Sequence, residues 1–182
     1  MARTDYETPS WLVRRVEQHL GLTFTLDAAA SAVLKKAPEY FGLDHTNPAC
    51  RDALAFAHWC AHPACCSAPV VWGNFPYTTG HPIEPWVERC GATARSGGTV
   101  VALLPSSRCT NWWHTHVIGH AAEVIDVRGR VSFLLDGEVG TRPMHEVVLV
   151  VWRPGVPPPL PHYGVPMSGR ASAAAKSVEE AA

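Results

Sequence analysis

The chain has 182 residues, a hydrophobic fraction of 47% and a formal net charge of -1 at pH 7. This length suits one domain with a single core, and the near-neutral charge argues against binding nucleic acid by bulk attraction, although a local basic cleft stays compatible with it. The longest apolar runs fall far short of the roughly 20 residues of a membrane helix, and no apolar signal region opens the sequence, so we expect a cytoplasmic protein without a membrane partner.

The spacing of apolar residues predicts helices and strands in alternation. The first helix has Thr8 as its cap, Pro9 in its first turn and Gly21 as its stop, and residues 42–66 are expected to be irregular. The segments predicted as helices are 8–21, 31–41 (broken near Pro38), 82–97 and 110–121. The segments predicted as strands are 22–27, 68–73, 98–107, 122–129, 131–135 and 146–153.

This alternation predicts an α/β fold with a three-layer, mostly parallel sheet. A turn at 136–137 should join the last two strands into an antiparallel hairpin that closes the sheet. The folded domain would span 1–153, and the Pro-rich and Ala/Ser-rich tail 154–182 is expected to be disordered. Such sheets bind ligands beyond the carboxyl ends of their parallel strands, where the sequence places Asp27 and Asn74.

Ligand-type side chains gather between residues 58 and 66. They are His58, Cys60, His62, Cys65 and Cys66. Zinc would accept such ligands, but the paired CxxC spacing of common structural sites is missing. The 6 cysteines of a chain without a secretion signal also favour free thiols over disulfides. We therefore expect a cysteine-rich loop and no metal site.

Residues 70–77, VVWGNFPY, lead from a buried strand directly into an amide, a rigid turn and an aromatic ring. The exocyclic amine of a nucleobase is a poor nucleophile, because its lone pair is delocalised into the ring. The Asn74 side-chain oxygen and a neighbouring backbone carbonyl could accept its two N–H groups and localise that pair. Pro76 would fix the turn, and Tyr77 could stack on the base.

Such a turn could support methyl transfer to a base amine. A base in a duplex would have to be flipped out to reach it. If the methyl donor is a sulfonium, transfer is a direct in-line displacement, whose rate depends on positioning and electrostatics more than on a strong base. The bare tetrapeptide also occurs as an ordinary loop, so its context has to decide.

Taken with further motifs, the turn resembles the phage-type DNA N6-adenine methyltransferase (Dam) family over residues 5–153. The motifs are, in chain order, DYETP, FTLDAAAS, EYF, VVWGNFPY, EPWVERC, VVALLPSSRCTNWWHTHV, RGRVSF and VVLVVWRP. The resemblance implies a Rossmann-like fold and methyl transfer from S-adenosyl-L-methionine to adenine N6 in double-stranded DNA. It also implies a phage or prophage protein that acts in the cytoplasm of a bacterial host cell.

The resemblance assigns roles to individual residues. It places the catalytic motif at Asn74, Phe75, Pro76 and Tyr77, where Phe75 replaces the usual proline. We expect this replacement to loosen the turn without removing its chemistry. The residues that it assigns to the methyl donor are Thr8, Pro9, Asp27, Ala28, Ala29, Asp52 and Asn74.

Several residues near the predicted ligand side of the sheet are candidates for holding DNA. They are Arg108, Thr110, Trp113, His114 and Arg130. Core packing is the alternative for Trp113, and pairing with an acidic neighbour is the alternative for Arg130.

Two other functions stay open. The enzyme could methylate cytosine N4, which is another exocyclic amine. Alternatively, the chain could be a catalytically weak relic that binds donor and DNA, a reading motivated by Phe75 and by the near-zero net charge.

Overall fold

The computed structural model describes residues 7–76, 82–128, 131–135, 138–139 and 146–155. Its helices within these ranges are α1 (Ser10–Leu20), α2 (Glu84–Arg95) and α3 (Asn111–His116), with short 3-10 helices at η1 (Pro48–Cys50), η2 (Ala53–Ala55) and η3 (Trp59–Ala61). Its strands are β1 (Leu26–Asp27), β2 (Glu39–Tyr40), β3 (Val70–Gly73), β4 (Thr99–Pro105), β5 (Glu123–Asp126), β6 (Leu134–Leu135), β7 (Glu138–Val139) and β8 (Val147–Trp152).

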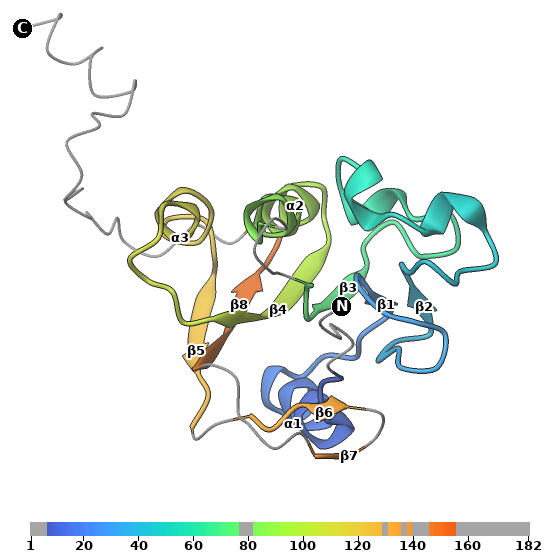
Figure 1. The fold of residues 1–182 in the computed structure, drawn as a ribbon. Coiled ribbons are helices and arrows are strands. Elements are labelled where there is room, and N and C mark those ends of the chain that lie inside the picture. The colour runs from blue at the N-terminus through green and yellow to red at the C-terminus, as the bar shows by residue number, and fades with distance from the viewer. Residues whose placement is uncertain (1–6, 77–81, 129–130, 136–137, 140–145, 156–182) are drawn as a thin grey trace, which may run out of the picture.

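A 6-stranded sheet with the order β2-β1-β3-β4-β8-β5 forms the centre of the fold, and Figure 1 shows this order from right to left. The neighbours among β2, β1, β3 and β4 pair in parallel. β8 runs antiparallel to both of its neighbours, β4 and β5, so β5 points the same way as β4. The α/β class predicted from the sequence is therefore confirmed, with a mixed sheet.

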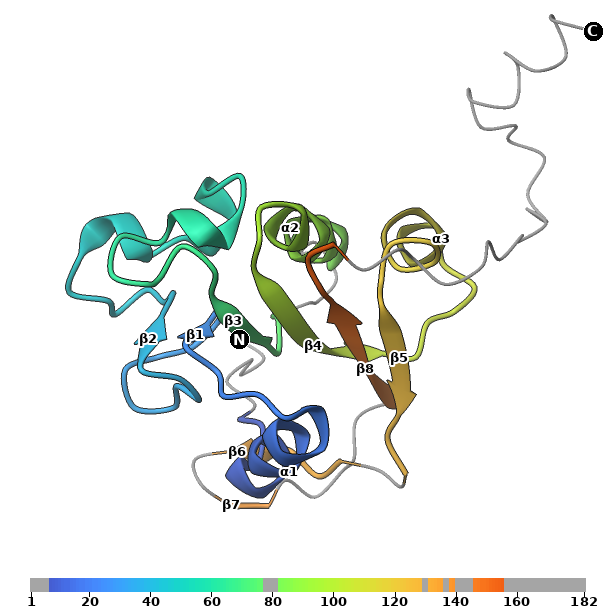
Figure 2. The ribbon, with the colours of Figure 1, turned by 180° about the vertical axis from the view of Figure 1, so that it is seen from behind.

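Both faces of the sheet are covered. Figures 1 and 2 show α1 and the β6–β7 hairpin on one face, with α2 and α3 on the other. Successive side chains of a strand point to opposite faces, so β4 sends Val100, Ala102 and Leu104 into the core beside α2. It sends Val101 and Leu103 into the core beside α1. This burial on both faces explains why β4 is a continuous apolar run in the sequence.

The expected hairpin between 131–135 and 146–153 is wrong. β6 pairs with β7 instead, and β8 lies between β4 and β5 in the main sheet. Every side chain of β8 is buried. A strand in the interior of a covered sheet is buried on both faces, whereas a strand of an isolated two-stranded hairpin is not. β6 joins the amino-terminal segment through two backbone hydrogen bonds of 2.9 Å between Glu7 and Leu134.

The helix predicted over 31–41 is also wrong. Residues 31–38 form turns and bends, and β2 follows. A carboxylate oxygen of Asp27 accepts the backbone N–H of Lys36 at 2.9 Å, and Pro38 opposes a helix. The segment therefore turns back and lays β2 beside β1. This hydrogen bond could not be predicted from the apolar pattern of residues 31–41, because its acceptor, Asp27, lies outside that segment.

The ends of α1 follow the sequence closely. The predicted stop at Gly21 is confirmed, with φ 64 in the left-handed region. The start differs by one position, since Pro9 is the cap and no side chain caps the helix. No helix within the described ranges is long and apolar enough to cross a membrane.

Replacing Gly21 by alanine should destabilise the protein by about 1 kcal/mol, because a Cβ is disfavoured at positive φ. A Cβ added there meets no atom within 4 Å, so backbone strain alone accounts for the loss. The matched control is Gly91→Ala inside α2, where the new Cβ meets only the Arg95 guanidinium at 3.3 Å. That change should stabilise by about 0.5–1 kcal/mol. Urea unfolding measures both, and equal signs for the two variants would contradict this account.

Candidate functional site

The carboxyl ends of β1 and β3 lie next to each other, as the sequence predicts. Asp27 pairs with Trp72, which precedes Asn74 by two positions. On the other side of β3, Gly73 pairs with Ala102 of β4. The parallel strands therefore bring the Asp27 segment and the Asn74 turn to one edge of the sheet, which we call the carboxyl edge.

Asp27 is a buried carboxylate that organises the loop after β1. It is 3% exposed, and its two oxygens accept the backbone N–H groups of Ala29 at 3.2 Å and Lys36 at 2.9 Å. Burial raises the pKa of Asp27 from 3.8 to about 6, although these two bonds and the charge of Lys36 oppose the rise. Asp27 thus closes the loop 28–36 at the carboxyl edge.

Asn74 lies directly beyond β3 and is half-buried. Its amide therefore is not packed into the core, and none of the hydrogen bonds within the described ranges occupies it. Pro76 is exposed beside it. Tyr77, the ring expected to stack on a base, lies outside the described residues.

Phe75 points back into the core. It is 3% exposed and stacks on Trp86 of α2, with ring centroids 4.9 Å apart and planes at 13°. Trp59 lies on the ring with a centroid distance of 5.8 Å. A Cβ added at Gly73 would come 2.5 Å from the Cε1 atom of Phe75, so only glycine leaves room for the ring. This anchor was not predicted from the sequence, where its signal is a glycine, Gly73, two positions before an aromatic residue.

The amino-terminal segment is tied to the Asp27 loop through Lys36. The Lys36 ammonium pairs with the Glu7 carboxylate at 2.5 Å, while its backbone N–H is bonded to Asp27. Thr8 and Pro9 follow Glu7 and are buried. The Thr8 hydroxyl has no hydrogen-bond partner in the part of the chain that the structure describes. The structure thus brings two segments assigned to the donor together and leaves a buried hydroxyl unsatisfied.

The other residues assigned to the donor differ in their surroundings. Ala28 is fully buried, and its N–H donates to the Trp72 carbonyl at 2.9 Å. Ala29 is half-buried. Asp52 is exposed and caps η2, where it accepts a backbone N–H at 2.9 Å. This local cap explains Asp52 without a ligand, so its contact with the donor stays a prediction.

Arg108 lies in the loop after β4, near the end of β5. Its guanidinium pairs with Asp126 at 2.6 Å and lies 5.7 Å from the centroid of the Trp113 ring. Trp113 itself is 3% exposed and packs in the core beside α2. It therefore has no face open to DNA, and the structure supports core packing, the alternative reading of this residue.

The remaining residues assigned to DNA are placed as follows. The Thr110 hydroxyl donates to the Ser107 carbonyl at 2.7 Å and so closes the turn before α3. His114 is half-buried on α3. Arg130 lies outside the described residues. Contacts of these side chains with DNA stay predictions.

The stretch between 58 and 66 contributes one residue to a larger group. His62 lies with His45 and Cys50, which come earlier in the chain. Neither His45 nor Cys50 was predicted to join this group, because both lie outside the stretch 58–66 in the chain. All the cysteines are free thiols, as expected.

A surface hollow in the described part of the chain lies away from the carboxyl edge. It is formed at the end of α1 and the approach to β1, which is the amino end of that strand. Its lining residues are Arg14, Glu17, Gln18, Gly21, Leu22 and Thr23. Its position excludes it as the site around Asn74.

Protonation of Asp27 should favour the folded state. Because burial raises its pKa from 3.8 to about 6, the folded protein binds the proton more tightly, and stability is gained as pH falls through this window and lost as pH rises. Asp27→Asn stays neutral throughout. The unfolding free energy of the wild type, minus that of Asp27→Asn, should therefore rise by about 2–3 kcal/mol between about pH 7 and pH 4. Urea unfolding at both pH values measures it, and a constant difference would refute the assignment.

The stability effects of Gly73 and Phe75 should be strongly coupled. Gly73→Ala alone should cost about 1–3 kcal/mol, because its Cβ displaces the Phe75 ring. In a Phe75→Ala background the ring is gone, so the same change should cost much less. A double-mutant cycle by denaturant unfolding gives the coupling. Additive effects would show that the ring does not lie against Gly73.

The comparisons with known proteins agree with the resemblance drawn from the sequence. A family model described as DNA N-6-adenine-methyltransferase (Dam) matches residues 1–158. The searches of curated proteins and of solved structures found no match. Because the family match covers most of the chain, the protein belongs to the DNA N-6-adenine-methyltransferase (Dam) family and is an N6-adenine DNA methyltransferase.

Proposed function

We propose that the carboxyl edge is the active site of a phage- or prophage-type enzyme with a Rossmann-like methyltransferase fold. It transfers a methyl group from S-adenosyl-L-methionine to adenine N6 in double-stranded DNA, in the cytoplasm of a bacterial host. The observation that carries this proposal is the pairing of β1 with β3, in which Asp27 is level with Trp72. This pairing sets the segment assigned to the donor beside the turn assigned to the base.

The residues of this edge fit the proposed donor. The Thr8 hydroxyl is a buried polar group without a partner in the described ranges, and a bound ligand would satisfy it. Asp27 already bonds two N–H groups of its own loop, so its main contribution is to hold Ala28 and Ala29 in place. When bound, S-adenosyl-L-methionine supplies an electrophilic methyl group on a sulfonium.

Asn74 acts on the target amine. Its side-chain oxygen accepts one N–H of the amine and a carbonyl of the turn accepts the other, which localises the lone pair on N6. A bound donor would supply its methyl group to this amine, and the proton released from N6 would pass to solvent. The acceleration comes from positioning and from fixed dipoles, because no strong base is required. Tyr77 would stack on the flipped base.

Phe75 supports this turn through the core. Its ring is held between Trp86 and Trp59, so the backbone next to Asn74 is anchored on α2. The usual proline restricts the same position by a ring in the backbone. Burial of an aromatic side chain here takes over that restriction, which argues against a relic with a loosened turn.

Arg108 is the best-placed contact for the DNA backbone. Its ion pair with Asp126 is exposed, with the Arg108 side chain at 51% and the Asp126 side chain at 80%. Exposed ion pairs stabilise little, so a phosphate can replace Asp126 at small cost. Thr110, His114 and Arg130 complete the proposed contact, and phosphate contacts of this kind position the duplex without reading its sequence.

Methyl transfer should depend on the Asn74 amide. Asn74→Ala should lower the single-turnover rate of methyl transfer by about 100-fold or more, because one fixed dipole at the reacting amine is lost. Transfer is measured with labelled donor on unmethylated DNA, and digestion of the product should yield N6-methyladenine. The rates are compared at saturating donor, with donor affinity measured by calorimetry, because the resemblance also assigns Asn74 to the donor.

Gln18→Ala is the matched control, since it removes an exposed amide from α1 and should leave the rate unchanged. Equal transfer by wild type and Asn74→Ala would refute the role of Asn74. Methylated cytosine in the product would refute the target base. Binding of donor and DNA by the wild type without transfer on any sequence would favour a relic.

A further inference from the structure

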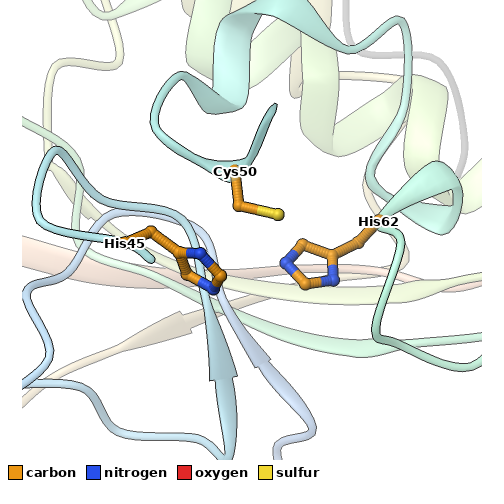
Figure 3. A group of neighbouring side chains, drawn as sticks. All are labelled: His45, Cys50 and His62. Carbon is orange, nitrogen blue, oxygen red and sulfur yellow. The ribbon is translucent and has the colours of Figure 1, made fainter. Parts of the chain in front are cut away.

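His45, Cys50 and His62 converge within the irregular segment 42–66. One ligand atom of each lies within 4.8 Å of the others, and Figure 3 shows the Cys50 sulfur and the two rings facing a common centre. Cys50 is fully buried, and His45 and His62 are 9% and 3% exposed. Three side chains with lone pairs suited to metals are therefore enclosed together.

The ring nitrogens show which atoms face this centre. The Nδ1 atoms of both rings accept backbone N–H groups two residues further on, from Asn47 at 3.0 Å and from Ala64 at 3.2 Å. The Nε2 atom of His62 is buried and has no hydrogen-bond partner in the described ranges. In Figure 3 this ring points towards Cys50 and His45. A buried ring nitrogen without a partner is costly, and this Nε2 atom becomes a metal ligand once its proton moves to Nδ1.

The rings are held by aromatic neighbours on β2 and just after it. The His45 ring packs on Tyr40 with centroids 4.6 Å apart, and the His62 ring meets Phe41 edge-on at 4.7 Å. These contacts restrict both imidazoles before any ligand arrives. Preorganised ligands of this kind bind a metal with a smaller loss of side-chain freedom.

We propose that His45, Cys50 and His62 bind one structural zinc ion. A thiolate and two imidazoles are ligands that zinc prefers, whereas calcium and magnesium prefer oxygen. Zinc–ligand bonds of about 2.0–2.3 Å place tetrahedral ligands about 3.5 Å apart. The three ligand atoms lie within 4.8 Å of one another, so zinc would draw them closer together. The site lies outside the proposed methyl-transfer chemistry and adds a structural function to it.

Tetrahedral zinc needs a fourth ligand. Within the described ranges, the side chains that converge on this centre supply three ligands. A water in the fourth position completes tetrahedral coordination.

The metal would cross-link a part of the chain with little regular structure. In the described residues, segment 42–66 contains only the short helices η1, η2 and η3. The zinc would join its beginning, middle and end, and hold it against Tyr40 and Phe41. Binding through Nε2 would also move the ring proton to Nδ1, so the bonds from Asn47 and Ala64 would be exchanged for metal bonds.

The test uses the full chain, expressed with zinc and purified without a histidine tag. Wild type should retain about one zinc ion per chain by elemental analysis, and cobalt in its place should give a thiolate charge-transfer band. Cys50→Ser should lose this band, and His62→Gln should lose most of the zinc. The matched control Cys60→Ser removes a thiol of the same segment that bonds to Thr93 instead, and it should keep both.

A second measurement needs no variant. Imidazole nitrogen NMR of the wild type should show both His45 and His62 with the proton on Nε2 in the metal-free protein, and on Nδ1 after zinc is added. A wild type that takes up no zinc, or whose two tautomers do not respond to it, would overturn the proposal. A cobalt band that survives in Cys50→Ser but disappears in Cys60→Ser would also overturn it.

Discussion

The parallel pairing of β1 with β3 is the constraint on which the site depends. Two strands that point the same way must end at the same edge of the sheet, and this pairing makes Asp27 level with Trp72. The loop after β1 and the turn after β3 therefore lie next to each other. The pairing of β1 with β3 involves few residues. It is supported by β4, which pairs with the other side of β3 and holds it in place.

Two buried groups stiffen the backbone where these strands end, and they do so differently. Asp27 uses a carboxylate whose desolvation raises its pKa to about 6, and it accepts two backbone N–H groups of the loop after β1. Phe75 uses an apolar ring stacked at 13° on Trp86. At neutral pH the charge of Asp27 makes the fold less stable than it is with Asp27 protonated, whereas the stacked Phe75 ring stabilises the fold independently of pH. A site built from both has a rigid turn beside a loop that is sensitive to protonation.

Much of the fold follows from local patterns, and the failures have a common cause. α1, β3, α2 and β4 were predictable, because each carries its own periodicity or capping residue. The helix expected over 31–41 failed because a carboxylate outside the segment captured the N–H of Lys36. The expected hairpin failed because apolar alternation does not say which strand will be the neighbour of β8. In each case a contact between distant parts of the chain decided the structure.

In the candidate site, too, features formed by consecutive residues were predictable, and features formed by residues distant in the chain were not. The turn at Asn74 could be predicted from the sequence, because its residues are consecutive and its chemistry is specific. The anchor of Phe75 and the group of His45, Cys50 and His62 could not, since their members meet only after folding. For Trp113 the sequence left two positions open, since an aromatic residue where a loop meets a helix fits both the surface and the core. Its burial shows that it lies in the core.

The position of β8 affects how the protein is made. β4 and β5 are synthesised early, yet the strand that separates them in the sheet comes last, with Trp152 opposite Val100. Within the described ranges β5 pairs with β8 alone, so before the ribosome releases β8, one edge of β4 is open and β5 is outside the sheet. A nascent chain in this state exposes backbone groups that invite pairing with other chains. The sheet is therefore completed only after β8 has been synthesised.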